Sequence, residues 1–197
     1  PEINQALLEL NNRQVHQLKN TPDLQKVLAE IDQPLVPILV QMERNGAKVD
    51  QKKVRIISKK FEDRISDLTS QVHKLAGKEF NLASPKQLGE VLFVDLKLSP
   101  VGVKKKKTGF STAADQLEKM ATLHPIIALV QEYRQIAKLK GTYLDPLENQ
   151  ISKKDGRVHG TFNLNIAATG RLSSSDPNLQ NIPIRTKLGR EVRSVFV

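Results

Sequence analysis

A short polar stretch, "TGRLSSSDPNLQNIPIR" at residues 169–185, holds the side chains best suited to chemistry or recognition. Its hydrogen-bonding side chains are Arg171, Asn178, Gln180, Asn181 and Arg185. The serines, asparagines and aspartate argue against a buried strand, and two prolines and a glycine argue against a helix. Arginine, asparagine and glutamine donate hydrogen bonds to base edges, so these residues suit contacts with nucleic acid from irregular backbone.

Donors of this kind can detect the shape of a base pair without reading its sequence. In the minor groove, purine N3 and pyrimidine O2 accept hydrogen bonds in every Watson–Crick pair. Pro177 and Pro183 would stiffen the backbone, because proline fixes φ and restricts the preceding residue. An ordinary ordered loop, whose side chains satisfy its own backbone, accounts for the same residues. The residues themselves leave both interpretations open.

Two basic groups elsewhere could contact phosphates. Lys104–Lys107 is a run of four lysines, which is either a solvated loop or a loose electrostatic contact with a phosphate backbone. Arg134 and Lys138 lie four residues apart and share one face of a predicted helix, with Lys140 beyond them. They either contact successive phosphates or are simply exposed beside an apolar stripe.

The chain shows no pattern typical of a complete active site. "GVKKKKTG" lacks the Gly-Lys-Ser/Thr of a phosphate loop, since Phe110 follows Gly109. No His, Asp and Glu residues have metal-ligand spacing, and no carboxylate pair suggests the two-metal site of nucleotidyl transfer. We therefore expect no catalytic residue, metal site or cofactor within this chain.

The composition predicts a globular protein with an anionic partner. Of 197 residues, 39% are hydrophobic and 26% are charged, and the net charge is +10. Residues 1–50 carry 5 basic and 7 acidic side chains, residues 51–150 carry 18 and 11, and residues 151–197 carry 8 and 3. The excess after residue 50 favours a phosphate backbone, although a basic protein without such a partner has the same composition.

Several partners and sites are disfavoured by composition. Zero cysteines exclude disulfides and thiolate metal sites. No apolar run approaches the roughly 20 residues of a membrane span, so no membrane partner is expected. Six Phe, two Tyr and no Trp leave few stacking platforms for single-stranded RNA.

Apolar spacing and cap residues predict helices over most of the chain. Short helices are expected at residues 3–18 and 22–31, and a third begins at Pro34 and Pro37 and stops at Gly46. Asp50 is a good N-cap for a long helix over residues 51–76, which Gly77 ends. Its apolar stripe, with steps of three and four, comprises Val54, Ile57, Phe61, Ile65, Leu68, Val72 and Leu75.

A second long helix is predicted from His124 to about Leu147. Its stripe comprises Ile126, Val130, Tyr133, Ile136 or Ala137, and Leu139. Between the long helices, residues 78–123 contain two helix starts, at Ser84-Pro85 and at Thr112 with Asp115. Two long helices around a compact insert predict an antiparallel pair that carries a tip, with the stripes used for core packing rather than for a partner.

The pattern changes to short β segments after Asn149. Asp155-Gly156 marks a turn, and "VHGTFNLNI" alternates as a strand does. The terminal "REVRSVFV" is apolar and predicts a further strand that needs a sheet to join. With a first residue, Pro1, that is not methionine, this predicts a piece of a longer protein.

The segment "ATGRLSSSDPNLQNIPIRTKLGREVRSVF" resembles the start of the polymerase domain of family A DNA polymerases, the bacterial DNA polymerase I group. Similar segments in the family order are "EIDQPLVPILVQMERNGAKVD", "FNLASPKQL", "HPIIALVQEYRQIAKLKGTYLDPL" and "DGRVHGTFNLNIAATGR". The resemblance covers roughly residue 30 to the end of the chain.

The resemblance implies a mainly α fold with a small β part. Long antiparallel thumb helices with a helical tip would precede the first strands of an incomplete palm. The implied divisions are residues 1–30, the tail of an upstream exonuclease-like domain; residues 31–149, the thumb with its tip at 78–123; and residues 150–197, the first part of the palm.

The resemblance also implies a function in template-directed DNA synthesis, for replication or repair. The chain would bind primer–template duplex through the minor groove and the backbone, and would be inactive alone. Mg²⁺, deoxynucleotides, the fingers and the rest of the palm would belong to the complete enzyme, a bacterial, cytoplasmic and nucleoid-associated DNA-directed DNA polymerase.

Individual roles follow from the same resemblance. Tip positions that approach the DNA backbone are Asn81, Ser84, Ser111 and Thr112. Thumb-helix positions that face phosphates are Arg134 and Lys138. Arg171 would reach the minor groove at the primer terminus, and further duplex contacts would come from Asn178, Gln180, Asn181 and Arg185. An alternative function is a stand-alone, non-catalytic module that binds double-stranded DNA.

Overall fold

The structure is a computed structural model that describes residues 2–106 and 109–197. Lys107, in the predicted lysine run, lies outside the described residues. The chain forms two compact units. The first comprises Pro1–Ala47 and His159–Gln180, and the second comprises Lys48–Val158 and Asn181–Val197.

Helices make up the amino-terminal part of the first unit. They are α1 (Glu2–Leu18), α2 (Pro22–Val27), a π-helical turn η1 (Leu28–Asp32) and α3 (Gln33–Asn45). The predicted break before Pro34 is wrong, because the helical path runs from α2 through η1 into α3. Pro34 lies in the first turn of α3, after the π turn, where a missing N–H is tolerated. Gly46 ends α3 with a φ of 60°, as predicted.

The remainder of the first unit is a short hairpin. Strands β5 (Thr161–Asn163) and β6 (Ser173–Ser175) pair antiparallel, with Phe162 opposite Ser174. The strand predicted for residues 158–166 is interrupted at His159 and Gly160. At Gly160 a Cβ atom would lie 3.3 Å from the carbonyl oxygens of both Ser175 and Pro177, so the close approach of two backbone segments requires glycine.

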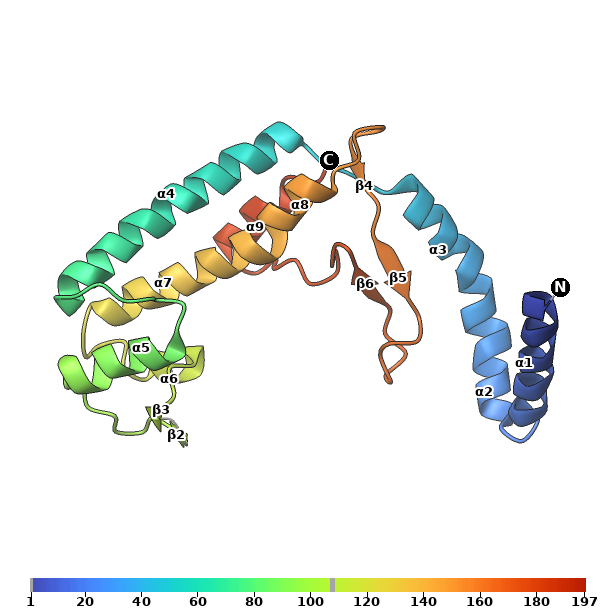
Figure 1. Ribbon diagram of the computed structural model, residues 1–197, viewed down its shortest axis with the longest axis horizontal. Helices are drawn as coiled ribbons and strands as arrows, with labels where there is room; N and C mark the ends of the chain where they lie inside the picture. The colour runs from blue at the N-terminus through green and yellow to red at the C-terminus, as the bar shows by residue number, and fades with distance from the viewer. Residues whose placement is uncertain (1, 107–108) are drawn as a thin grey trace. The chain divides into compact units, whose positions relative to one another are not determined.

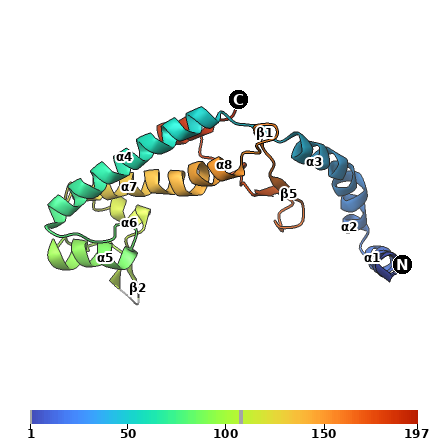
Figure 2. The ribbon, with the colours of Figure 1, turned by 45° about the horizontal axis from the view of Figure 1, so that its top comes forward.

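Two long helical segments form the frame of the second unit, as predicted. They are α4 (Gln51–Ala76) and the continuous run of α7 (Ile126–Leu139), the π-helical turn η3 (Lys140–Leu144) and α8 (Asp145–Gln150). Figures 1 and 2 show α4 and α7 side by side and pointing in opposite directions. The N-cap of α4 is Asp50, whose carboxylate accepts from Lys53 N at 3.0 Å, and Gly77 follows the helix with a φ of 70°.

The apolar stripes of α4 and α7 supply two neighbouring cores. One core lies at the α8 end of the pair and includes Val54, Ile57, Phe61, Leu68, Ile136, Leu139 and Leu144. The other lies at the tip and includes Val72, Leu88, Val91, Leu117, Ile126, Ile127 and Val130. Two members of the predicted α4 stripe differ: Ile65 is only partly buried and Leu75 is 37% exposed.

The tip, residues 78–123, folds over the end of the helix pair. It contains α5 (Pro85–Glu90), the π-helical turn η2 (Val91–Asp95), strands β2 (Lys105–Lys106) and β3 (Gly109–Phe110), and α6 (Ala114–Glu118). Figure 1 shows α5 and α6 beside the end of α4 and α7. Ser84 caps α5 as predicted, with Oγ 3.4 Å from the Gln87 N–H.

Two sequence-based expectations in the tip are wrong. The N-cap of α6 is Ala113, without a side-chain cap, because Thr112 contacts Arg134 instead. The lysine run is not simply a loop, since Lys105 and Lys106 form strand β2 opposite β3. The Lys105 Nζ lies 6.0 Å from the centre of the Phe110 ring, within the range of a cation–π contact.

The carboxyl-terminal segment is the largest departure from the sequence-based expectation. "REVRSVFV" was predicted as a strand, but Lys187–Arg193 forms helix α9, capped by Thr186 Oγ1, which accepts from Gly189 N at 3.0 Å. Val192 and Val195 are three residues apart and buried, which is helical spacing rather than strand alternation. Extended pairing is limited to a single bridge between Val49 and Phe196 and its flanking hydrogen bonds.

A further two-stranded sheet is also small. Strand β4 (Arg157–Val158) pairs with β1 (Ala47–Lys48). The turn predicted at Asp155-Gly156 is present, with a φ of 69° at Gly156, but it joins a helix to β4 rather than two strands. The predicted mainly α fold, with an antiparallel long-helix pair, a helical tip and a small β part, is confirmed. Among the described helices, none is long and apolar enough to cross a membrane.

Leu68 and Leu75 on α4 provide a matched pair of substitutions. Leu68 is fully buried in the core and Leu75 is 37% exposed. Leu68→Ala should lower the free energy of unfolding by about 2–5 kcal/mol, because it leaves a cavity. Leu75→Ala should lower it by less than about 1 kcal/mol. Urea denaturation followed by circular dichroism measures both values, and equal losses would contradict the assignment of Leu68 to the core.

Candidate nucleic-acid interface

The tip encloses a pocket of about 960 Å³. Four of the residues predicted to approach DNA line it together: Ser84, Ser111, Thr112 and Arg134. The walls also include the rings of Phe93 and Phe110, whose centres lie 5.1 Å apart. These aromatic walls were not predicted, because nothing in the local sequence indicates that η2 and β3 come together.

Arg134 projects from α7 to the loop that follows β3. Its Nη1 donates to the carbonyl oxygen of Thr112, and its Nη2 lies 3.3 Å from Thr112 Oγ1. Within residues 2–106 and 109–197, no carboxylate forms an ion pair with this guanidinium, and its partial burial lowers the pKa of Arg134. A half-buried cation without a counter-charge favours the approach of an anion.

The polar side chains around the pocket shape the backbone. Ser111 and Thr112 are each only 4% exposed, and Ser111 Oγ lies 3.3 Å from the Ala113 N–H, which it accepts. Asn81, just outside the pocket, accepts from the Ala83 N–H through Oδ1 at 2.9 Å. A serine or threonine hydroxyl that accepts a hydrogen bond retains its own hydrogen as a donor. These polar side chains therefore hold the loops in shape, and Ser111 and Thr112 also line the pocket.

Lys138 differs from Arg134 although both lie on the predicted helix face. Its side chain is exposed, and no hydrogen bond or ion pair joins it to any residue in the described part of the chain. Its charge is therefore available to solvent or to a phosphate. Arg134, by contrast, connects α7 to the tip.

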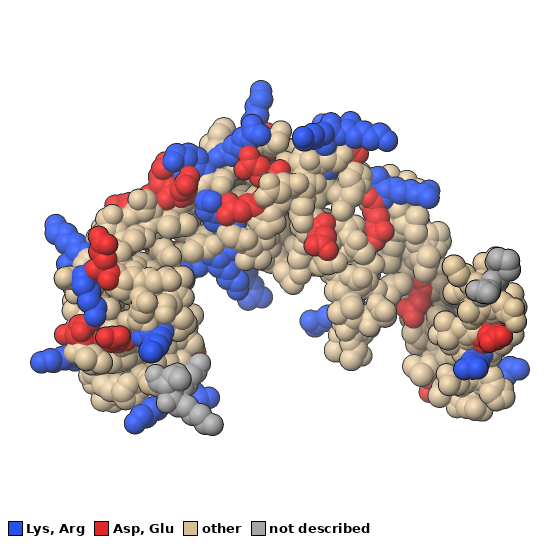
Figure 3. Space-filling model, viewed as in Figure 1, with Lys and Arg blue, Asp and Glu red and all other residues tan. Residues whose placement is uncertain are grey.

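Most of the basic side chains on α4 are paired within the second unit. Arg55 contacts Glu148, Lys59 contacts Glu62 and Asp63, and Lys60 contacts Glu191 at 2.6 Å. Figure 3 shows acidic side chains among the basic ones along α4 and on the tip, so this face carries no continuous basic patch. These exposed pairs each contribute little to stability.

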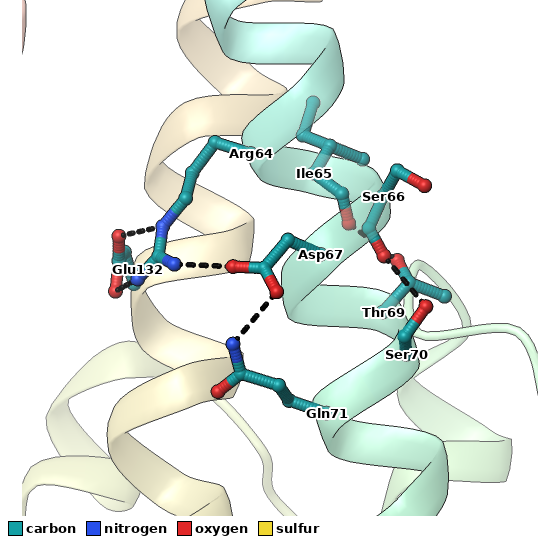
Figure 4. A network of polar contacts seen from close by, with 8 residues as sticks. All are labelled: Arg64, Ile65, Ser66, Asp67, Thr69, Ser70, Gln71 and Glu132. Atoms are coloured by element: carbon teal, nitrogen blue, oxygen red, sulfur yellow. Dashed lines mark hydrogen bonds and ion pairs between the residues drawn. The ribbon is translucent and has the colours of Figure 1, made fainter.

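A further ion pair on α4, formed by Arg64 and Glu132, joins α4 to α7 (Figure 4). Arg64 donates to both carboxylate oxygens of Glu132, at 2.8 and 2.9 Å, and to Asp67 at 2.5 Å. The hydrogen bond to Glu132 raises the pKa of Arg64, and the Gln71 amide, 2.9 Å from Asp67, lowers the pKa of Asp67. The fork gives two hydrogen bonds between α4 and α7 at a partly exposed position.

Residues 169–180 belong to the first unit and include part of the polar stretch. Ser174 is buried, and its hydroxyl accepts from the N–H groups of Leu179 and Gln180 at 3.0 and 3.3 Å. The side chains of Arg171, Asn178 and Gln180 are exposed. A serine therefore satisfies the loop backbone, as the ordinary-loop interpretation expects, and the longer side chains are exposed; their contact with base pairs stays a prediction.

The sequence argument against strand structure was wrong for one part of this stretch. Ser173–Ser175 forms β6, in which alternate residues face the unit interior. The serine triplet could have indicated this strand. A small side chain with a hydroxyl can be buried in a strand once the hydroxyl accepts backbone hydrogen bonds. The Asp176-Pro177 peptide that follows is cis.

Asn181 and Arg185 lie in the second unit, and both side chains are exposed. Their backbones are held from two elements: the Tyr143 hydroxyl donates to the Asn181 carbonyl oxygen, and Arg190 Nη1 donates to the Arg185 carbonyl oxygen at 3.0 Å. Tyr143 was not predicted as a functional residue: it lies within the helix predicted from His124 to about Leu147, and nothing in the local sequence indicates its contact with Asn181.

The described residues contain no group of three or more His, Asp or Glu side chains that could hold a metal ion. Chemically, the arrangement offers hydrogen-bond donors and cations for binding an anionic polymer.

Comparison with known proteins identifies similar sequences. The family model described as "DNA polymerase family A" matches residues 51–197. DNA polymerase I of Geobacillus stearothermophilus is 47% identical over 172 residues, which cover 87% of this chain and 19% of that protein. DNA polymerase I of Bacillus subtilis is 43% identical over 192 residues, which cover 98% of this chain and 22% of that protein. The chain thus spans about a fifth of the length of these curated relatives.

A solved structure is similar in fold as well as in sequence. It is described as the POL domain of Pol1 from M. smegmatis in complex with DNA primer-template and dNTP. The sequence identity is 41% and the TM-score is 0.89, over 96% of this chain and 33% of that one.

Arg134 and Lys138 should respond differently to truncation. Arg134→Ala removes both contacts to Thr112 and should lower the free energy of unfolding by about 1–3 kcal/mol. Lys138→Ala should change it by no more than about 0.5 kcal/mol. Thermal and urea unfolding of the two variants against the wild type measure the difference. An Arg134→Ala variant as stable as Lys138→Ala would show that the guanidinium does not hold the tip.

Proposed function

The chain belongs to DNA polymerase family A, and from this premise we propose that it is the part of a DNA-directed DNA polymerase that holds the primer–template duplex. Residues 31–149 would form the thumb, with the tip at 78–123, and residues 150–197 would form the first part of the palm. Residues 1–30 would be the end of an upstream exonuclease-like domain. A bacterial, nucleoid-associated location is part of the same proposal.

One observation carries this proposal. The solved POL domain with which the chain shares 41% identity and a TM-score of 0.89 is described as a complex with DNA primer-template and dNTP. The similarity covers 96% of this chain and includes the sequence as well as the fold. The simplest inference is therefore that this chain binds a related partner. The net charge of +10 supports a polyanionic partner independently.

The proposed binding uses two kinds of side chain. Lys138 and the tip hydroxyls of Ser84, Ser111 and Thr112 would contact backbone phosphates, with Arg134 contributing its uncompensated charge. The outward donors would meet the minor groove: Arg171, Asn178, Gln180, Asn181 and Arg185. Such contacts depend on groove shape and on acceptors common to all base pairs, so we expect little sequence preference.

The chemical step would require residues beyond those described here. Polymerases transfer nucleotides at a site with two Mg²⁺ ions held by carboxylates. The described residues provide no cluster that fits two such ions. We therefore propose that this chain positions the duplex, that it is inactive alone, and that deoxynucleotides bind only to the complete enzyme with its fingers and remaining palm.

The first test is the salt dependence of duplex binding. The 197-residue chain should bind duplexes of unrelated sequence with similar affinity, and log Kd should rise steeply and linearly with log salt concentration. Lys138→Ala should weaken binding to every duplex and reduce the slope by about 1, for one lost phosphate contact. Fluorescence anisotropy at several salt concentrations measures both. Absence of binding at low salt would contradict the proposed function.

The second test concerns the minor-groove donor. In a longer polymerase that contains this chain and a catalytic palm, Arg171→Ala should reduce primer extension by at least about tenfold, while duplex affinity changes much less. The reason is that Arg171 would fix the primer terminus rather than supply most of the binding energy. Single-turnover extension and anisotropy on the same variant separate the two effects. Unchanged extension would remove Arg171 from the proposed role.

A further inference from the structure

In the second unit, the hydroxyl of Tyr143 connects the long-helix pair to Asn181 by a hydrogen bond. The Tyr143 side chain is almost completely enclosed, at 8% exposed, and its hydroxyl donates to the Asn181 carbonyl oxygen. Buried phenol groups normally require a hydrogen-bond partner, since an unmade bond is costly. This hydrogen bond therefore constrains the position of the Asn181 carbonyl group as well as that of the tyrosine ring.

The π turn η3 determines where Tyr143 points. Leu139 and Leu144 are five residues apart, yet both are buried in the same core. In an uninterrupted α-helix, positions five apart are separated by roughly 140° around the axis. In η3 the Asp145 N–H bonds to the Lys140 carbonyl, which accommodates one extra residue in the turn and returns Leu144 to the core face.

The local sequence explains why the extra residue falls at this point. Pro146 has no N–H, so it cannot bond to the carbonyl of Thr142 as an α-helix requires. Gly141 lies inside the turn, where a Cβ would have no neighbour within 4 Å, so no side chain packs at that position. The π turn is thus built into the helix immediately before the proline, and it carries Tyr143 toward the segment that begins at Asn181.

The segment that Tyr143 contacts is held at its other end as well, since Arg190 Nη1 donates to the Arg185 carbonyl oxygen at 3.0 Å; the Tyr143 hydrogen bond acts at its amino-terminal residue. Ile182 and Leu188 pack against the same core as Tyr143 and are partly buried. The side chains of Asn181 and Arg185 are exposed and lie on either side of Ile182–Ile184. A hydrogen bond to the Asn181 carbonyl fixes the peptide from which the exposed asparagine side chain leaves.

We propose that Tyr143 is a positioning residue for duplex recognition: through its hydroxyl it fixes Asn181 on the thumb helices, so that the Asn181 side chain is held in place for the minor groove. This inference rests on the proposed function. A donor that detects base-pair shape must itself be fixed to within a fraction of an ångström, because a mobile donor also reaches a displaced acceptor. Tyr143 touches no DNA in this proposal and acts only through Asn181.

The chain offers a matched control, since it contains two tyrosines. Tyr133 lies on α7, is partly buried and packs against both cores, but its hydroxyl has no hydrogen bond to another residue of the described chain. Tyr143→Phe and Tyr133→Phe each remove one hydroxyl and keep the ring. A difference between the two variants therefore reports the hydrogen bond to Asn181 rather than ring packing.

The first experiment measures the tether without DNA. Backbone ¹⁵N relaxation on the 197-residue chain gives order parameters for Asn181 and Ile182, next to the Tyr143 hydrogen bond. In the wild type and in Tyr133→Phe these should be about 0.85, the value of rigid backbone, and in Tyr143→Phe they should fall below about 0.6. Unchanged order parameters in Tyr143→Phe would overturn the assignment.

The second experiment measures the effect on the duplex by anisotropy in a double-mutant cycle. Tyr143→Phe should raise the Kd for duplex about three- to tenfold, and Tyr133→Phe should leave it within about twofold. In an Asn181→Ala background, Tyr143→Phe should have an effect of less than about twofold, because the side chain that it positions is gone. An equally large effect in both backgrounds would overturn the role through Asn181.

The two proposals fail in distinguishable ways. A wild-type chain that binds no duplex at low salt overturns the proposed function, and the relaxation experiment still decides whether Tyr143 orders Asn181 and Ile182. A wild-type chain that binds duplex, with no coupling between Tyr143 and Asn181, overturns the positioning role alone.

Discussion

The packing of α4 against the run of α7, η3 and α8 is the constraint on which the second unit depends. One apolar stripe on each helix supplies both cores, with Phe61 and Ile136 in one and Val72 and Val130 in the other. Burial of such side chains is the main favourable term in folding, and it fixes the rotation of each helix about its own axis. The fork between Arg64 and Glu132 adds two hydrogen bonds between the helices that fit this alignment.

The side chains proposed to bind DNA are positioned in two ways: by the long-helix pair, or by short polar side chains that hydrogen-bond to the loop backbone. Arg134 leaves α7 toward the tip and Tyr143 leaves η3 toward Asn181, so each position is set by the rotation of the same helix. The shorter side chains, such as Ser111 and Ser174, accept hydrogen bonds from nearby backbone N–H groups. Loop backbone is thereby satisfied internally, while Lys138, Arg171 and Gln180 remain exposed.

Local signals in the sequence were reliable wherever local physics determines the outcome. Asp50 and Gly77 set the limits of α4, because capping and left-handed backbone involve only neighbouring residues. Thr112 and the carboxyl terminus were predicted incorrectly for the opposite reason. Threonine is a common helix cap, but the Thr112 hydroxyl instead contacts the guanidinium of Arg134 on α7, 22 residues away in sequence. Val192, Val195 and Val197 suit a strand or a helix face, and only the core available to Val192 and Val195 distinguishes the two.

The sequence by itself determined the helical frame, the basic charge and the identity of the outward donors, because periodicity, net charge and residue type are properties of the chain alone. The tertiary structure decided which of these groups are used internally. It pairs most α4 cations with carboxylates, joins Arg134 to Thr112 and joins the Tyr143 hydroxyl to the Asn181 carbonyl oxygen. These outcomes depend on distances between residues remote in sequence, which are fixed only when the two long helices bury their stripes against each other.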